Sequence, residues 1–128
     1  MNLTAQDTKR YSRHLLLDKV GETGQLKLKK AKVLVIGAGG LGCPVLQYLG
    51  AAGVGEIGIV DFDVIDESNL QRQILFDTND VGKSKAITAK EKLENQNSHI
   101  QITAYNQALN NKNAIDLFQQ FDIIIDGT

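Results

Sequence analysis

The chain has 128 residues, of which 42% are hydrophobic and 23% charged, and its formal net charge is −1. This size and composition are typical of one globular domain and argue against long disorder. The balanced charge excludes a large basic surface, so we expect neither nucleic acid nor a membrane as a partner. No apolar run could span a bilayer and the N-terminus has no signal-peptide core. With a single cysteine, Cys43, these features predict a cytoplasmic protein.

Residues 1–30 form a polar, helix-prone N-terminal segment. Short helices are expected there, and Gly21 and Gly24 predict a turn between them. The lysines near the end of this segment are typical of a solvated helix face.

Residues 31–128 alternate between apolar runs and helical patterns. The apolar runs that predict strands are 33–36, 57–60, 100–105 and 121–126, and the helical patterns are 43–52, 83–94 and 113–119. Continuous apolar runs indicate strands that are buried on both faces, as in a parallel sheet. The order predicts an α/β fold: a Rossmann-like, mostly parallel sheet with flanking helices, preceded by short N-terminal helices.

The strongest local signal is a glycine-rich loop between the first strand and the next helix. Gly37, Gly39 and Gly42 have the spacing of a nucleotide-binding fingerprint, and Asp61 ends the next strand, about 20 residues later. Glycines let the backbone approach phosphate oxygens, and the helix N-terminus presents free N–H groups to them. A carboxylate in the position of Asp61 can accept hydrogen bonds from ribose hydroxyls. The fingerprint alone is also compatible with a simple tight turn.

Two cations follow the acid at the edge of the sheet where ligands bind. Arg72 and Lys85 suit an enzyme that cleaves a triphosphate, because the charge that builds on its oxygens must be met by fixed cations. Asn69 and Gln73 add amide donors and acceptors. From spacing alone, ordinary surface charges are an equally good interpretation of Arg72 and Lys85.

Six motifs in one order resemble the N-terminal part of the ThiF/MoeB/HesA family, the bacterial relatives of ubiquitin-activating enzymes. The motifs are Arg10-Tyr11-Ser12-Arg13, Gly37-Ala38-Gly39-Gly40-Leu41-Gly42, Gly53-Val54-Gly55, Asp61-Phe62-Asp63, Ser68-Asn69-Leu70-Gln71-Arg72-Gln73 and Asp80-Val81-Gly82-x-x-Lys85. The resemblance runs from about residue 8 to Thr128.

This resemblance implies ATP-dependent adenylation of the C-terminal glycine of a ubiquitin-like sulfur carrier of the ThiS or MoaD type. The products would be an acyl-adenylate and pyrophosphate, and the pathway thiamine or molybdopterin biosynthesis. Arg13 matches an arginine that family dimers deliver into the neighbouring subunit's site, so a homodimer is expected. Arg13, Arg72 and Lys85 are the expected catalytic residues. The expected ATP-binding residues are Gly37, Gly39, Gly40, Gly42, Asp61, Ser68, Asn69, Leu70, Gln71, Arg72, Gln73 and Lys85.

The chain departs from the family pattern at its last residues. The family has a Cys-Thr-Asp-Asn sequence whose Asp helps to hold Mg²⁺, whereas this chain reads Asp126-Gly127-Thr128. We therefore expect the principal magnesium ligand just beyond Thr128, no metal ligand within the chain, and zinc only in a further C-terminal part. The domain 31–128 is expected to be incomplete, and residues 1–128 alone to be inactive and to fold partly or to associate.

Two other functions remain open from the sequence. The glycine fingerprint and Asp61 also suit an NAD(P)-binding oxidoreductase, although this class does not explain Arg72 and Lys85. The second alternative is a non-catalytic nucleotide-binding fragment.

The other chemically notable residues have structural interpretations. Cys43 is expected to be a buried packing thiol, and His14 and His99 lack metal-ligand spacing. Tyr11 and Tyr48 are expected to pack in the protein. Asp63 either assists magnesium or caps its loop, and we favour the loop.

Overall fold

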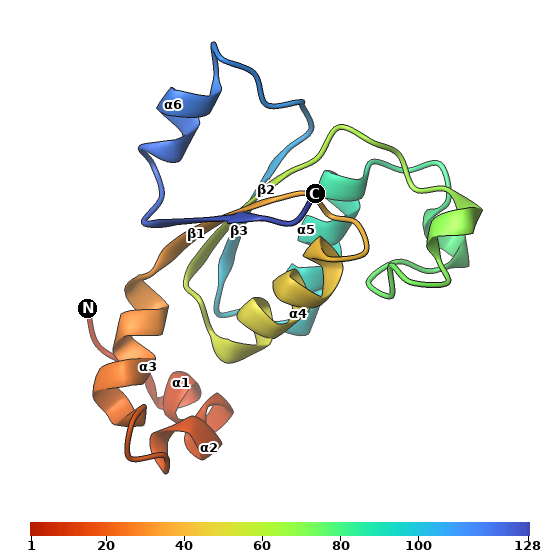
Figure 1. Cartoon of the computed structure of the whole chain (residues 1–128). Coiled ribbons are helices and arrows are strands. Elements are labelled where there is room, and N and C mark those ends of the chain that lie inside the picture. Colours follow the sequence, from red (N-terminus) through yellow and green to blue (C-terminus); the bar gives the residue numbers. More distant parts are fainter.

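Four parallel strands form the sheet in the computed structural model, which describes residues 1–128 (Figure 1). The strands are β1 (Lys32–Ile36), β2 (Glu56–Val60), β3 (Gln101–Tyr105) and β4 (Ile123–Asp126), in the spatial order β3-β2-β1-β4. Each adjacent pair runs in parallel, with Leu34 opposite both Gly58 and Ile124. The predicted α/β fold with a parallel sheet is confirmed.

Helices cover both faces of this sheet. The helices are α1 (Ala5–Arg10), α2 (Ser12–Leu15), α3 (Gly21–Lys30), α4 (Gly42–Ala52), α5 (Lys85–Gln96) and α6 (Ala114–Phe118), with short 3-10 turns at η1 (Glu67–Asn69) and η2 (Thr78–Asp80). α4 and α5 bury the larger apolar cluster, which includes Leu46 and Leu93 of the helices and Val35 and Ile57 of the strands. α6 lies over the opposite face, where Leu117 joins the smaller cluster (Figure 1). None of the helices is long and apolar enough to cross a lipid bilayer.

The glycine turn predicted within the N-terminal segment is wrong in position. The chain turns at residues 16–20, one turn earlier, where the amides of Val20 and Gly21 donate to the carbonyl of Leu17. Gly21 has a φ of +56° and begins α3, and Gly24 lies inside that helix. The positive φ at Gly21, the first residue of α3, completes the turn, so a second glycine break is not needed.

The N-terminal helices pack on the sheet domain at the end that lies away from the C-termini of the strands (Figure 1). The amide of Gly55, just before β2, donates to the carbonyl of Leu28 in α3. The buried carboxylate of Asp7 pairs with Lys29 at 2.6 Å and with Nδ1 of His99 at 2.9 Å. Residues 1–30 are thus tied to residues 31–128 by both backbone and side-chain contacts.

Candidate functional site

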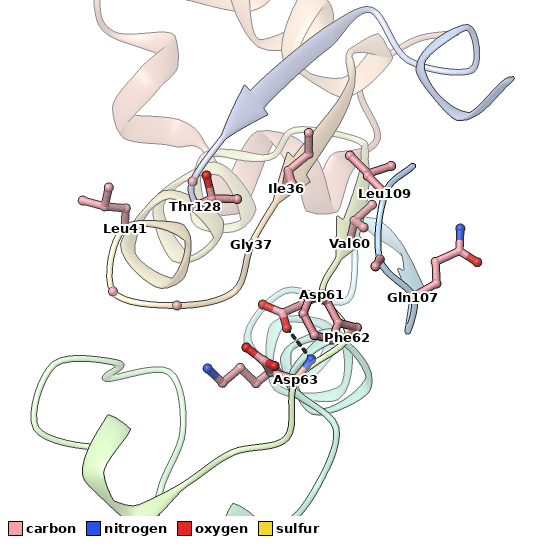
Figure 2. Close-up of a pocket in the computed structure, with 15 residues that line it drawn as sticks. Ile36, Gly37, Leu41, Val60, Asp61, Phe62, Asp63, Gln107, Leu109 and Thr128 are labelled. Carbon is pink, nitrogen blue, oxygen red and sulfur yellow. Dashed lines mark hydrogen bonds between the residues drawn. The ribbon is translucent and has the colours of Figure 1, made fainter. Parts of the chain in front are cut away.

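A cavity of about 500 Å³ opens at the carboxyl ends of the strands (Figure 2). Residues at or just after the end of each strand line it, namely Ile36, Val60, Gln107 and Gly127. From β1 the chain continues to β2 and β3 on one side, whereas β4 pairs on the other side. Ligands of open α/β sheets bind at such a switch point. The volume suits a small-molecule ligand.

The glycine loop connects β1 to α4 and forms one wall of this cavity. Gly37 has a φ of +97°, which other residues rarely adopt. A β-carbon at Gly42 would lie 1.8 Å from the carbonyl oxygen of Gly37, so only glycine fits there. Gly37, Gly39 and Gly40 line the cavity, and Gly42 begins the 11-residue α4 behind them. The loop and the helix N-terminus together favour an anion.

Asp61 follows the last residue of β2 and lines the same cavity. Its Oδ2 accepts from the backbone amide of Ala38 at 2.8 Å. Its Oδ1 accepts from the backbone amide of Asp63 at 2.8 Å (Figure 2). The first bond ties the carboxylate to the glycine loop. Both bonds orient the carboxylate and leave lone pairs for hydroxyl donors of a ligand.

Two cationic side chains lie beside the loop. Lys85 is the first residue of α5, is 6% exposed, lines the cavity and forms no ion pair. The Cδ and Nε atoms of Arg72 lie 3.5 Å from the position of a β-carbon at Gly40. Arg72 is exposed and makes one long hydrogen bond, to the carbonyl oxygen of Ser68. Arg72 and Lys85, which the sequence alone could not distinguish from ordinary surface charges, thus both lie near the glycine loop.

The segment that carries Arg72 is held by local hydrogen bonds. Asp66 accepts from the amide of Ser68, and its own amide donates to Oδ1 of Asn69 at 2.9 Å. Hydrogen bonds from Ser68 lower the pKa of Asp66, and the charge of Lys85 adds to this effect. Oδ1 of Asn69 is used in this way, while its NH₂ group makes no hydrogen bond within the chain and is available to a ligand.

Gln73 lies directly beneath the loop. It is 3% exposed, and its Nε2 lies 3.5 Å from the position of a β-carbon at Gly39. Its Oε1 is the buried side-chain polar atom that has no hydrogen-bond partner. An unsatisfied acceptor beside such a loop is typical of a site that a ligand or water completes.

The predicted site residues that do not line the cavity are Arg13, Gly42, Ser68, Asn69, Leu70, Gln71, Arg72 and Gln73, although Gly42, Arg72 and Gln73 lie against the glycine loop. Ser68 and Gln71 are exposed on the outer side of their segment, and Leu70 packs against the larger apolar cluster. Arg13 lies on α2, at the far end of α4 from the cavity (Figure 1). These assignments stay predictions.

Sequence reasoning also missed part of the cavity. The missed lining residues are Ile36, Leu41, Val60, Phe62, Gln107, Ala108, Leu109, Gly127 and Thr128. The residues at 107–109 follow β3, and the rule that ligands bind beyond the carboxyl ends of parallel strands could have found them.

The predicted burial is confirmed for Cys43 and Tyr11, whereas Tyr48 lies at the surface. Cys43 is fully buried, and burial raises the pKa of its thiol to about 11, although the amide of Leu75 and the charge of Lys85 oppose this. Tyr11 is buried as predicted, but Tyr48 is 79% exposed, so the packing prediction for Tyr48 is wrong. The outer face of α4, which carries Tyr48, has no element over it within this fold.

Both histidines make structural hydrogen bonds. Nδ1 of His14 lies 2.9 Å from Oε1 of Gln25, and Nδ1 of His99 lies 2.9 Å from Oδ1 of Asp7.

The carbonyl of Asp63 accepts from the amide of Lys85, which fits the predicted loop role. The side chain of Asp63 lines the cavity.

The arrangement suits a nucleoside phosphate. It combines an anion-binding loop, a carboxylate placed for hydroxyl groups, and two cations. No three His, Cys, Asp or Glu side chains are grouped to hold a metal ion. Mg²⁺ that accompanies a nucleotide needs only one or two carboxylates besides the phosphates, and Asp63 offers one on the cavity wall.

Comparison with protein families identifies the group to which this fold and loop belong. The model of the ThiF family matches residues 11–128. The chain belongs to the ThiF family. The resemblance inferred from the six motifs is thereby confirmed.

Individual relatives are similar over nearly the whole chain. It is 55% identical over 126 residues to the probable adenylyltransferase/sulfurtransferase MoeZ of Mycobacterium tuberculosis, covering 98% of this chain and 32% of MoeZ. It is 44% identical over 128 residues to the sulfur carrier protein adenylyltransferase of Thermus thermophilus, covering 100% of this chain and 47% of that protein. The chain thus spans about a third to a half of the length of these relatives.

A solved structure shows the same fold with a nucleotide. The crystal structure of Escherichia coli MccB with ATP superposes with a TM-score of 0.80 at 35% identity. The match covers 94% of this chain and 37% of MccB. This ThiF-family fold therefore occurs in a protein crystallised with ATP.

Proposed function

We propose that the protein adenylates the C-terminal glycine of a ubiquitin-like sulfur carrier of the ThiS or MoaD type, in thiamine or molybdopterin biosynthesis. The observation that carries this proposal is that the glycine loop, Asp61 and Lys85 line one cavity, with Arg72 against the loop at Gly40. The relatives named as adenylyltransferases and the MccB structure with ATP support it.

In this proposal ATP lies over the glycine loop, with its ribose hydroxyls on Asp61. The two backbone hydrogen bonds to Asp61 hold the carboxylate in place before the ribose arrives. Lys85 and Arg72 lie near the phosphates, where they offset the charge that builds during the reaction. Because Lys85 is largely buried, water screens its charge less than that of a surface lysine.

The carrier supplies the nucleophile. An oxygen of its C-terminal carboxylate forms a bond to the α-phosphorus, and the bond from that phosphorus to the oxygen bridging the β-phosphate breaks. Pyrophosphate leaves with the electron pair, and the acyl-adenylate remains. Since the nucleophile is already an anion, no general base is required, and positioning and charge neutralisation supply the catalysis.

Arg13 acts, in this proposal, in the site of a second copy. α4 has 11 residues, so its ends lie about 16 Å apart, and Arg13 lies at the end remote from the cavity. This separation argues against a contact between Arg13 and the phosphates of its own chain. A homodimer that presents α2 to the neighbouring cavity would supply the third cation.

Magnesium is expected to accompany ATP. The sequence predicted no metal ligand within the chain, but Asp63 lies on the cavity wall and would supply one carboxylate ligand, with the phosphates and water completing the shell. The ion would withdraw charge from the phosphate oxygens.

Carrier-dependent exchange of labelled pyrophosphate into ATP tests the proposal. The complete natural polypeptide should catalyse exchange with a ThiS-type or a MoaD-type carrier, and the carrier that supports exchange identifies the pathway. A carrier without its terminal glycine is the control and should support none. Binding of NAD but not ATP, with no exchange for either carrier, would instead establish the oxidoreductase alternative.

A further inference from the structure

Two buried amide side chains hold the C-terminal end of α4. Asn97 is 1% exposed, and its Nδ2 donates to the carbonyl of Gly50 at 2.9 Å. Gln25 is fully buried, and its Nε2 donates to the carbonyl of Ala52 at 2.9 Å. The last carbonyls of a helix lack partners within the helix. The Gln25 bond satisfies that of Ala52, and the Asn97 bond adds to the one that Gly50 accepts from the amide of Gly53. Asn97 itself follows the last residue of α5.

The same amide of Asn97 also holds Tyr11. Nδ2 donates to Oη of Tyr11 at 2.7 Å, and Tyr11 is 5% exposed. Its ring lies against Gly53, where a β-carbon would come within 2.6 Å of Cζ. His99 meets the ring edge-on at a centroid distance of 6.1 Å. Tyr11 is therefore fixed at its hydroxyl and along its ring.

Tyr11 in turn precedes the segment that carries Arg13. α2 begins at Ser12 and has only four residues, which is too short to be stable without tertiary contacts. Arg13 is exposed and makes no hydrogen bond or ion pair within the chain. The backbone of α2, which carries Arg13, is therefore held by the contacts of Tyr11 together with the hydrogen bond between His14 and Gln25.

The contacts of Tyr11 with Asn97 and Gly53, called the anchor below, are also connected to the cavity through two helices. α4 begins at the glycine loop with Gly42, and α5 begins with Lys85. Both helices run side by side beneath the sheet and end at the anchor, at Gly53 and Asn97 (Figure 1). The position of Arg13 is thus set by the two helices that also begin at the cavity.

We propose that Asn97 is a positioning residue for Arg13: by bonding Tyr11 to the end of α4, it sets the angle at which α2 presents the arginine to a second copy. This assignment rests on the proposed function and on the action of Arg13 in the neighbouring site. It adds a residue that neither borders the cavity nor contacts the nucleotide.

Mixed dimers test the assignment in the complete polypeptide. Asn97→Ala should lower carrier-dependent exchange at least about tenfold, because small misplacements of a catalytic group are costly. Mixing the Asn97→Ala protein with the Lys85→Ala protein should restore about a quarter of wild-type exchange. Half of the dimers are then mixed, and one of the two sites in each has both Lys85 and a well-placed Arg13. Mixing the Asn97→Ala protein with Arg13→Ala should restore nothing. If Asn97 acted only in overall folding, the mixture with Lys85→Ala and the mixture with Arg13→Ala would give the same result.

A double variant supplies the second readout. Arg13→Ala combined with Asn97→Ala should be no slower than Arg13→Ala alone, because both changes remove the same contribution. Asn95→Ala, an exposed position on the same helix, is the matched control and should match wild type. If Asn97→Ala does not fold, Tyr11→Phe removes only the hydroxyl and should behave in the same way in the mixtures.

Two results would overturn the assignment. One is recovery of exchange when Asn97→Ala is mixed with Arg13→Ala, and the other is exchange in the double variant that is a further tenfold below that of Arg13→Ala. Failure of the proposed function has a different signature. Wild-type protein would then show no carrier-dependent exchange at all, and the role of Asn97 would fall with it. An Arg13→Ala protein as active as wild type would overturn the role of Arg13 and of its anchor, while leaving adenylation standing.

Discussion

Lys85 is the residue whose environment is least like that of an ordinary surface lysine. It is 6% exposed, forms no ion pair and lines the cavity. We expect Lys85→Ala to slow carrier-dependent exchange about 100-fold, which is typical of removing one group that stabilises transition-state charge. Arg72→Ala should have a similar effect. Lys83→Ala is the control, since Lys83 is exposed and pairs with Asp80. Rates within about threefold of wild type for both variants would refute the phosphate assignment.

Asp61 combines a structural and a binding role. Asn at this position keeps one acceptor but places an NH₂ group against the amide of Ala38 or Asp63, so one backbone hydrogen bond is lost. We expect Asp61→Asn to weaken ATP binding about tenfold, measured by calorimetry, because a charge-assisted hydrogen bond to the ribose is also lost. Circular dichroism should show a folded protein. Unchanged affinity would remove Asp61 from the ribose.

The thiol of Cys43 should be inert in the folded protein. Burial raises its pKa to about 11, so the thiolate that attacks thiol reagents is scarce at pH 8. We expect reaction with Ellman's reagent at pH 8 to be roughly 100-fold slower than that of a free thiol. Denatured protein should react at the free-thiol rate. Rapid labelling of the native protein would show that the end of the glycine loop opens to solvent.

At the scale of elements, the attachment of α1 depends on pH. Burial tends to raise the pKa of Asp7, but hydrogen bonds from Lys29, from the Thr4 amide and from His99 outweigh it and hold this pKa far below its ordinary value. A lowered folded-state pKa contributes stability that is present above about pH 4 and is lost as the pH falls below it. We therefore expect the N-terminal helices to detach at acid pH before the sheet unfolds.

Urea unfolding at pH 7 and at pH 3 measures this contribution. Asp7→Asn should lower the free energy of unfolding at pH 7 by about 3 kcal/mol, because it leaves the partly buried Lys29 and His99 without a charged partner. The loss between pH 7 and pH 3 should be smaller in this variant than in wild type. Asp18→Asn, an exposed position, is the control. Equal pH dependence in wild type and Asp7→Asn would exclude Asp7 as the source.

At the scale of the whole molecule, the outer edge of β4 predicts association. β4 pairs only with β1, and Ile123 and Ile124 are 53% and 36% exposed. An uncovered apolar edge strand pairs readily with another chain. Residues 1–128 produced alone should therefore self-associate in light-scattering measurements at about 100 μM. Ile123→Lys should shift the protein towards monomer, whereas Ile115→Lys, on the exposed face of α6, should not. A monomeric wild-type polypeptide would contradict this expectation.

Much of the fold and of the cavity could be predicted because the signals are local. The apolar runs predicted all four strands, and the spacing of Gly37, Gly39 and Gly42 predicted the loop where the structure has it. Lys85 and Asp61 border the same cavity as expected. Such patterns depend on the period of a strand or on the space available to a glycine, which neighbouring residues decide.

The tertiary structure alone decided the rest. Asn97 and Tyr11 lie 86 positions apart, and nothing in the residues around either one indicates their hydrogen bond. The ion pairs of Asp7 likewise join distant segments. The exposure of Tyr48 depends on which helix face the sheet covers. The sequence by itself determined the family, the sheet and the glycine loop. Packing determined which polar groups are buried, because burial depends on distant segments that meet.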